Sequence, residues 1–186
     1  MRKLAFITSN KHKFAQVELV LKKYKIKLEH VAIDYPEDKE KEMKEISLEA
    51  AKNLAEKLNR PVIVEDTGLY FMAYNNFPGA QPKFVFNSLG FRGIFKLLEG
   101  ENREAYFKSV IGYCEPGKEP LSFEGEMRGK IIDKVVLPEK DAMPYEHIFV
   151  ADGYSEAFVE MDIELKNSFS QRGKATKKLG DYLLKK

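Results

Sequence analysis

The feature that most constrains the fold is a change of hydrophobic period part-way along the chain. Up to residue 64, short apolar runs of strand length alternate with segments whose apolar residues recur at helical spacing. From about residue 105, apolar and polar residues alternate with a period of two. The first pattern is typical of α/β proteins, and the second predicts an antiparallel hairpin. The sequence therefore predicts an α/β fold in which a hairpin extends a mixed β-sheet into a second lobe.

The expected elements follow from these patterns and from the turn residues between them. The uninterrupted β-branched run Val62–Val64, which follows Pro61, favours a buried and central strand. No internal repeat or linker divides the chain, so we expect residues 1–186 to form a single two-lobed domain. The expected strands are Lys3–Thr8, Leu28–Ile33 and Val62–Val64, the hairpin is Ala105–Cys114 with Leu121–Ile132, and the helices are Lys11–Lys23, Ile46–Asn59, Lys83–Glu99 with a break at Gly90, and Leu165–Leu184.

Composition excludes several classes of partner. With 31 Lys and Arg against 29 Asp and Glu, the net charge is +2, which counts against a dedicated nucleic-acid-binding protein. No run of about 18 apolar residues occurs, and the N-terminal apolar run is too short for a signal peptide, so we expect no membrane partner. Cys114 is the one cysteine, which rules out an internal disulfide and a cysteine-based zinc site. We therefore expect a cytoplasmic protein that holds any anionic ligand at a local site.

The first candidate site is the polar segment where the first strand ends and the first helix begins. Unpaired backbone N–H groups and the macrodipole favour an anion at a helix N-terminus, and a lysine one turn into the helix can reach the same anion. The alternative is a plain N-cap at Ser9 or Asn10 with exposed lysines. The segment comprises Thr8, Ser9, Asn10, Lys11, His12 and Lys13.

The second candidate site is the run Glu65-Asp66-Thr67-Gly68, directly after the central strand. Ligands of α/β sheets gather beyond the carboxyl ends of the strands, where the first candidate site also lies. Adjacent carboxylates there are costly unless they bind a cation or accept hydrogen bonds. A period of two sends Glu65 and Asp66 to opposite faces, so we expect one of them to point at the phosphate-binding segment. The alternative is a turn in which Asp66 caps the chain from Leu69 onward.

Together the two segments indicate a Mg²⁺-dependent reaction on a phosphorylated small molecule. Magnesium is usually held by one or two carboxylates together with waters and substrate phosphates. It also lowers the pKa of a bound water enough to make a nucleophile. A second carboxylate is available in the stretch Asp34-Tyr35-Pro36-Glu37.

Seven short strings, in order over nearly the whole chain, resemble those of the inosine triphosphate pyrophosphatases, also called Ham1-like purine nucleoside triphosphate pyrophosphatases. They are T-S-N-x-x-K at 8–13, Y-P-E at 35–37, V-E-D-T-G-L at 64–69, F-P-G at 77–79, A-Y-F-K-S-V-I-G-Y at 105–113, F-x-G-x-x-x-G-x-I at 123–131, and F-V-E-M…K-N…S-Q-R at 158–172.

The resemblance implies hydrolysis of ITP, XTP or their deoxy forms to the monophosphate and pyrophosphate, with Mg²⁺ as cofactor. It also implies an elongated two-lobed α/β fold around a long mixed sheet with flanking helices, and a homodimer. By position, the segment from Thr8 to Lys13 would hold the triphosphate, with Lys13 as the principal cation. Glu37 and Asp66 would bind Mg²⁺, Asp66 would accept a proton from the attacking water, and Thr67 would touch the substrate.

The base-binding region departs from the family pattern. Relatives carry F-G-[YW]-D-P, and the aligned residues here are Met143, Pro144, Tyr145, Glu146 and His147. Met143 has no aromatic face to stack on a purine. The family's S-H-R becomes Ser170-Gln171-Arg172, while Lys166 and Arg172 are kept, and Arg172 can donate to a purine 6-oxo group. The implied base-binding residues are Met143, Pro144, Tyr145, Glu146, Lys166, Gln171 and Arg172.

Two other function classes remain open at this point. The altered base-binding region is compatible with a nucleotide-binding module that has little or no turnover. A single-strand nucleic-acid binder would instead use the phenylalanines and the C-terminal lysines, and its binding would depend steeply on salt.

Overall fold

The computed structural model of the chain describes residues 2–33, 35 and 41–186. Their elements are, in chain order, β1 (Arg2–Ile7), α1 (Lys11–Lys22), β2 (Ile26–Val31), α2 (Met43–Leu58), β3 (Val62–Phe71), β4 (Pro78–Gly79), α3 (Pro82–Leu97), β5 (Glu104–Cys114), β6 (Leu121–Ile131), the 3₁₀ helix η1 (Pro144–His147), β7 (Phe149–Ala151), the 3₁₀ helix η2 (Phe158–Glu160), α4 (Ile163–Phe169) and α5 (Gln171–Leu184).

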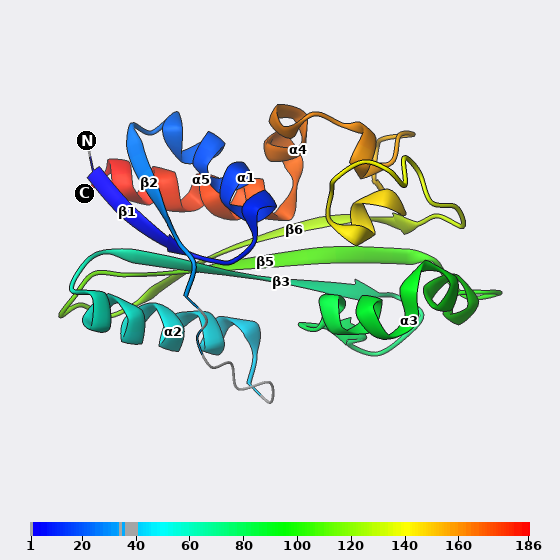
Figure 1. Ribbon diagram of the computed structural model, residues 1–186, viewed down its shortest axis with the longest axis horizontal. Coiled ribbons are helices and arrows are strands. Elements are labelled where there is room, and N and C mark those ends of the chain that lie inside the picture. Colours follow the sequence, from blue (N-terminus) through cyan, green and yellow to red (C-terminus); the bar gives the residue numbers. More distant parts are fainter. Residues whose placement is uncertain (1, 34, 36–40) are drawn as a thin grey trace.

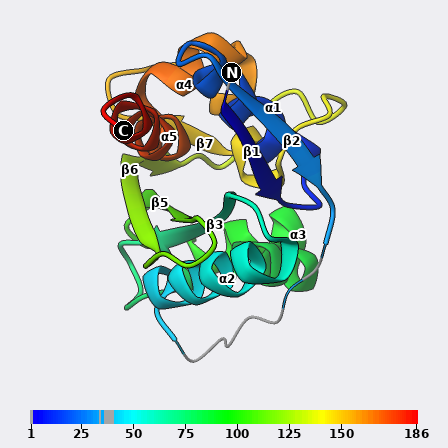
Figure 2. The same ribbon diagram turned by 90° about the vertical axis from the view of Figure 1, so that its left-hand side faces the viewer.

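One seven-stranded sheet runs through the molecule in the order β2-β1-β3-β5-β6-β7, with β4 paired to β3. Strand β1 is parallel to β2 and β3, whereas the β3–β5, β5–β6 and β6–β7 pairs are antiparallel. The prediction of a mixed α/β sheet with a long hairpin is therefore confirmed. Helices cover both faces at one end, with α1 and α5 on one side and α2 on the other (Figures 1 and 2).

The length of the central strands gives the molecule its elongated shape (Figure 1). Strand β3 pairs with β5 along its whole ten-residue length, from Val62 to Phe71. Its pairing with β1 covers just Val62 and Ile63. The distal parts of β3, β5 and β6 thus extend past β1 and carry α3, η1 and β7, which form the second lobe (Figure 1).

Among the described residues, three of the apolar clusters join helices to the sheet. On one face α1 and α5 pack on the sheet through residues such as Val17, Leu179 and Ile63, and on the other face α2 packs through Leu54 against Val64. The third cluster lies in the second lobe and joins α3, η1 and β7 to the sheet. It includes Leu69, Phe71, Ile94, Leu98, Phe107, Met127, Ile131, Tyr145 and Phe149.

The predicted end of the central strand was wrong. Strand β3 continues from Val64 to Phe71 because the whole of it finds an antiparallel partner in β5. The run from Glu65 to Gly68 therefore lies inside a strand, and the alternative of a turn capped by Asp66 is also wrong. A three-residue apolar run could not reveal this extension, because it depends on pairing with residues about 45 positions later.

The helical predictions need smaller changes. The break in α3 is confirmed, since Gly90 has φ 61° and ψ −176°, a conformation that favours glycine. The C-terminal helix is divided at Ser170, whose extended backbone (φ −66°, ψ 161°) ends α4 and whose hydroxyl caps α5 by accepting from the Gly173 N–H. Cys114 is buried, as its apolar surroundings indicated.

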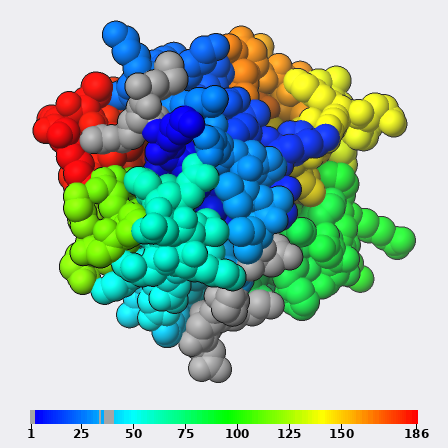
Figure 3. All heavy atoms as spheres, turned by 60° about the vertical axis from the view of Figure 1, so that its left-hand side comes forward, coloured from blue at the N-terminus to red at the C-terminus, as the bar shows by residue number. Residues whose placement is uncertain are grey.

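On the surface, segments far apart in the sequence adjoin one another. Figure 3 shows the first strands (blue) between the C-terminal segment (red) and the segment around η1 (yellow), with α2 (cyan) below them. Among the residues that the structure describes, no helix combines the length and apolar character needed to cross a membrane.

Candidate active site

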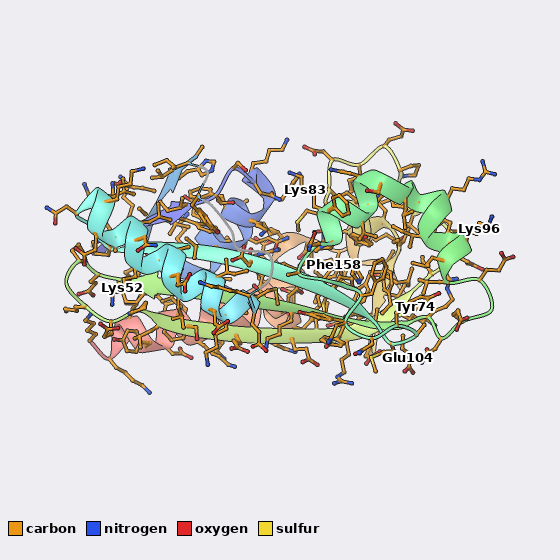
Figure 4. All side chains as sticks on the ribbon, turned by 90° about the horizontal axis from the view of Figure 1, so that it is seen from below. Lys52, Tyr74, Lys83, Lys96, Glu104 and Phe158 are labelled. Carbon is orange, nitrogen blue, oxygen red and sulfur yellow. The ribbon has the colours of Figure 1, made fainter. Side chains whose placement is uncertain are left out.

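A cavity of about 530 Å³ lies where the two lobes meet. One wall is built from the β1–α1 junction, β3 and the start of α5, and the other from α3 and η1. Figure 4 labels two lining residues, Lys83 at the start of α3 and Phe158 of η2, at the end of the second lobe nearest the N-terminal elements. Of the expected site residues, those on the cavity lining are Thr8, Ser9, Asn10, His12, Lys13, Asp66, Thr67, Met143, Pro144, Tyr145, Glu146, Gln171 and Arg172.

The β1–α1 junction places its polar side chains at the start of a helix. Asn10 is the N-cap, and its side-chain oxygen accepts from the backbone N–H groups of His12 (2.9 Å) and Lys13 (3.2 Å). Capping therefore occurs here through Asn10 and not through Ser9. The capping by Asn10 does not exclude a ligand at this junction. Thr8, Ser9 and Lys13 still face the cavity beside the positive end of the helix.

Lys11 and His12 connect the two walls. The Lys11 ammonium lies 2.6 Å from one carboxylate oxygen of Asp141, and His12 Nε2 lies 3.1 Å from the other. Lys11 is 73% exposed and is not on the lining. The start of α1 is thereby joined to the loop that precedes η1. Sequence reasoning missed Asp141, because nothing in its spacing relates it to a helix about 130 residues earlier.

The most buried charges of the site form a cluster around Glu65. Lys13 Nζ lies 2.9 Å from Glu65 Oε2 and also donates to the Glu65 backbone oxygen at 3.0 Å, while Arg172 Nε lies 3.2 Å from Oε1. The hydroxyls of Thr67 (2.6 Å) and Ser109 donate to the same Oε1. Burial alone would raise the pKa of Glu65, but Arg172, Lys13 and the two hydroxyls lower it to about 2. Glu65 is therefore a fully buried carboxylate that stays ionised.

Asp66 points to the other face of β3, as the period of two predicted. The Ser47 hydroxyl of α2 donates to Asp66 Oδ2 at 3.0 Å, and Asp66 lines the same cavity as Glu65. The carboxylate that meets Lys13 is thus Glu65, and Asp66 approaches the cavity from the α2 side. Ser47 is a second residue that sequence reasoning missed.

The start of α5 is held close to the sheet. A Cβ at Gly125 of β6 would lie 2.0 Å from the backbone oxygen of Gln171, so this approach needs a glycine. Arg172 is buried, and besides Glu65 it donates to the side-chain oxygens of Gln16 and Thr67 (2.9 Å). Gln171 Oε1 is also buried and lines the cavity, and it accepts no hydrogen bond from the part of the chain that the structure describes.

The opposite wall is the 3₁₀ helix η1. Glu146 is buried and pairs with Lys166 of α4 at 2.6 Å, and Lys166 Nζ lies 4.9 Å from the centre of the Phe158 ring. Lys166 itself is not on the lining. The Tyr145 hydroxyl donates to the Pro82 backbone oxygen at 3.1 Å, and burial raises the pKa of Tyr145. His147 turns away from the cavity and contacts the Val136 backbone oxygen through Nδ1 at 2.9 Å.

Sequence reasoning also missed the four lining residues of α3, which are Pro82, Lys83, Phe86 and Asn87. Lys83 and Phe86 come from the first two turns of this helix and face the β1–α1 junction across the cavity. The sequence does carry a signal for the helix start at Lys83, since Pro82 is favoured in the first turn of a helix. The phenylalanines of this helix recur at helical spacing, which is more typical of a packed apolar face than of a ligand site.

The residues that could hold a metal ion are few. Among the described residues, no group of three or more His, Cys, Asp or Glu side chains is arranged to hold a metal ion. Asp66 is a carboxylate on the lining, and Glu37, the second expected ligand, lies outside the described residues. Any ion beside Asp66 would therefore need further oxygen donors, such as substrate phosphates.

Residues 4–182 match the model of the Ham1 family. The chain belongs to the Ham1 family. Among curated Ham1 relatives, the dITP/XTP pyrophosphatase of Methanopyrus kandleri is 42% identical over 97% of this chain and 95% of its own length. The dITP/XTP pyrophosphatase of Methanosarcina mazei is 43% identical over 94% of each chain. Among solved structures, a HAM1 protein from Coxiella burnetii matches with a TM-score of 0.82 at 24% identity over both whole chains, which confirms the fold.

Proposed function

We propose that this protein hydrolyses dITP, ITP and XTP to the nucleoside monophosphate and pyrophosphate in a Mg²⁺-dependent reaction. The full-length relatives that carry the name dITP/XTP pyrophosphatase support this substrate class. The observation that carries the proposal is one cavity with a cationic helix start and Asp66 on one wall and base-binding groups nearby. A volume of about 530 Å³ lies within the range of small-molecule sites.

The triphosphate would lie along the β1–α1 junction. Lys13, the hydroxyls of Thr8 and Ser9 and the positive end of α1 provide charge and hydrogen-bond donors for phosphate oxygens. Asp66, on the adjacent strand, would accept a proton from the attacking water. Lys83 would bring a second cation from α3 across the cavity.

The base would lie between η1 and the start of α5. Hypoxanthine and xanthine carry an N1–H donor and a 6-oxo acceptor, whereas adenine carries an acceptor and an amino group at these positions. Gln171 Oε1 has no partner among the described residues and can accept from N1–H, and the Arg172 guanidinium has more N–H groups than its protein partners use. This pairing would favour the 6-oxo purines, because adenine would leave the buried amide oxygen unsatisfied.

The donor set fits magnesium. Mg²⁺ prefers hard oxygen ligands and usually combines one or two carboxylates with substrate phosphates and water, so Asp66 together with Glu37 would hold it. When bound, the ion supplies charge neutralisation on the phosphates and a more acidic water. Ser47 donates to Oδ2 of Asp66 and so orients this carboxylate at the edge of the cavity.

We further propose that the chain works as a single two-lobed domain in a cytoplasmic homodimer. The resemblance to the inosine triphosphate pyrophosphatases supports this arrangement. Sedimentation of the purified protein would test the dimer, since a monomer at assay concentration would contradict it.

Pyrophosphate release from dITP with Mg²⁺ tests the proposed reaction. The wild-type protein should release pyrophosphate and dIMP in equal amounts, and Asp66→Asn should abolish most of this release. Asp152→Asn is a matched control, because Asp152 is exposed and lies outside the cavity. Orthophosphate as the product would contradict the proposal, and tight dITP binding without turnover would favour the nucleotide-binding module instead.

A further inference from the structure

The cluster around Glu65 contains a charge that the proposed reaction does not use. Glu65 neither faces Ser47 nor belongs to the expected ligand set, yet its side chain is fully buried and in contact with cations from two different helices. Burial of an ionised carboxylate is costly unless the charge is paired and hydrogen-bonded. Here Glu65 Oε2 lies 2.9 Å from Lys13 Nζ, and Glu65 Oε1 lies 3.2 Å from Arg172 Nε. Removing these three charged groups from water costs free energy, so a function of the cluster would explain why the chain buries them.

We infer that Glu65 is the positioning residue for Lys13, and that it holds the ammonium of Lys13 toward the triphosphate while it offsets the charge of Arg172. This inference rests on the proposed function, and it assigns a role to a residue outside the expected triphosphate-binding segment and metal-ligand set.

The contacts of Lys13 carry the inference. An ammonium has three N–H donors, and two of its contacts are to Glu65, one to the side chain (2.9 Å) and one to the backbone oxygen (3.0 Å). Both come from β3, the strand at the centre of the sheet. Lys13 is 20% exposed and lines the cavity, so its ammonium stays accessible to a ligand. A flexible lysine is thus fixed at its tip before any substrate arrives, which is how preorganisation favours a reaction.

Charge balance gives the second step of the argument. Lys13 and Arg172 each lie about 3 Å from the same carboxylate, so without Glu65 the two cations would repel each other. Lys13, on the long flexible side chain, would turn toward solvent, whereas Arg172 would stay held by Gln16 and Thr67. The hydroxyl of Ser109, which is buried and not on the lining, fixes the carboxylate from behind.

The two consequences of removing Glu65 act in opposite directions on binding and on turnover. Loss of a negative charge beside the cavity strengthens the attraction for any polyphosphate. Loss of the anchor for Lys13 misplaces the cation relative to the phosphate that reacts. A residue with a purely structural role would not separate the two effects.

The test uses Glu65→Gln, and its control is Glu115→Gln. Glu115 also contacts two lysines, Lys118 and Lys186, and accepts from the Tyr113 hydroxyl, but it lies outside the cavity. The dissociation constant of inorganic tripolyphosphate is measured calorimetrically without metal, and kcat is measured for dITP with Mg²⁺. For Glu65→Gln we expect the dissociation constant to fall at least about threefold and kcat to fall at least about tenfold, with neither changed in Glu115→Gln.

A kcat close to wild type, or a dissociation constant that does not fall, would overturn the inference. If Glu65→Gln does not fold, Ser109→Ala replaces it. This variant keeps the charge and loosens the carboxylate, so kcat should fall about threefold with KM unchanged, and an unchanged kcat would overturn the inference. If wild-type protein hydrolyses no triphosphate, the proposed function fails, while a tripolyphosphate affinity that does not rise in Glu65→Gln would still refute the role of Glu65.

Discussion

The two walls of the cavity each contain a buried carboxylate that pairs with a lysine, but they differ in charge balance. On the sheet wall, Glu65 faces both Lys13 and Arg172 and accepts from two hydroxyls. On the η1 wall, Glu146 pairs with Lys166 alone among the described cations, at 2.6 Å. The first group carries a surplus positive charge, and the second is neutral.

This difference suits the two ends of a nucleoside triphosphate. The surplus cation is next to the helix start, where the charged phosphates would lie. Glu146 of the neutral pair lines the cavity together with its neighbours Met143 and Tyr145, where an uncharged base would lie. Substitutions of Lys13 and Asp66 on the sheet wall should therefore slow every triphosphate by a similar factor. Substitutions on the η1 wall should change the preference among bases.

The largest effect is expected from Asp66→Asn. The amide cannot accept a proton from water, so kcat should fall by about 10³ for dITP and for dATP alike. Steady-state pyrophosphate release from both nucleotides measures this. A loss confined to one base would contradict the separation of the two walls.

Lys166→Met should have the next largest effect, and it acts on stability. It leaves Glu146 buried without its cation, which costs about 3 kcal/mol in the free energy of unfolding. Denaturant titration measures the loss. The matched variant Glu146→Gln with Lys166→Met removes both charges, and it should recover part of the lost stability and change the ratio of dITP to dATP turnover.

Lys13→Met removes the principal cation of the sheet wall. We expect KM for all triphosphates to rise by about 100-fold, because a charge-assisted contact to phosphate is lost while Arg172 still neutralises Glu65. The exposed Lys11 gives the control, and Lys11→Met should raise KM at most about threefold. Equal effects of the two substitutions would contradict the central position of Lys13.

Met143→Phe tests the η1 wall through a smaller expected change in KM. An aromatic ring can stack on a purine, so KM for dITP and XTP should fall by roughly threefold with kcat unchanged. Competition assays between nucleotides measure the change. A uniform change for purine and pyrimidine triphosphates would be evidence that residue 143 does not touch the base.

The smallest effect is expected at Glu115, which repeats the two-cation arrangement outside the cavity. Hydrogen bonds from Lys118, Lys186 and Tyr113 lower its pKa from 4.5 to about 2. Because the pKa is lower in the folded state, the stabilisation is present above pH 4.5 and is lost as the pH falls toward 2. Glu115→Gln should thus lower the free energy of unfolding by under about 1 kcal/mol at pH 7, and the two proteins should converge at pH 2.

The sequence predicted the parts of this molecule that depend on local pattern. The strand and helix at Lys3–Lys23, the hairpin from Ala105 and the break at Gly90 were predicted because each has its own period or turn residue. The opposite faces of Glu65 and Asp66 followed from strand geometry alone. The helix that carries Lys13 was also placed correctly.

Contacts between segments far apart in the sequence could not be predicted from local pattern. The extension of β3 depends on β5, and the pairing of Asp141 with Lys11 depends on how two loops meet. The role of Glu65 was hidden for the same reason, since its cations come from α1 and α5. The sequence located the two carboxylates, but the packing of three elements decides which one Lys13 meets.

The most direct test of the account is kcat/KM for pyrophosphate release from dITP, XTP and dATP by the wild-type protein with Mg²⁺. If Gln171 and Arg172 read a 6-oxo purine while Lys13 and Asp66 perform the chemistry, dITP and XTP should exceed dATP by about 100-fold. Equal values for the three nucleotides, or no pyrophosphate from any of them, would contradict it.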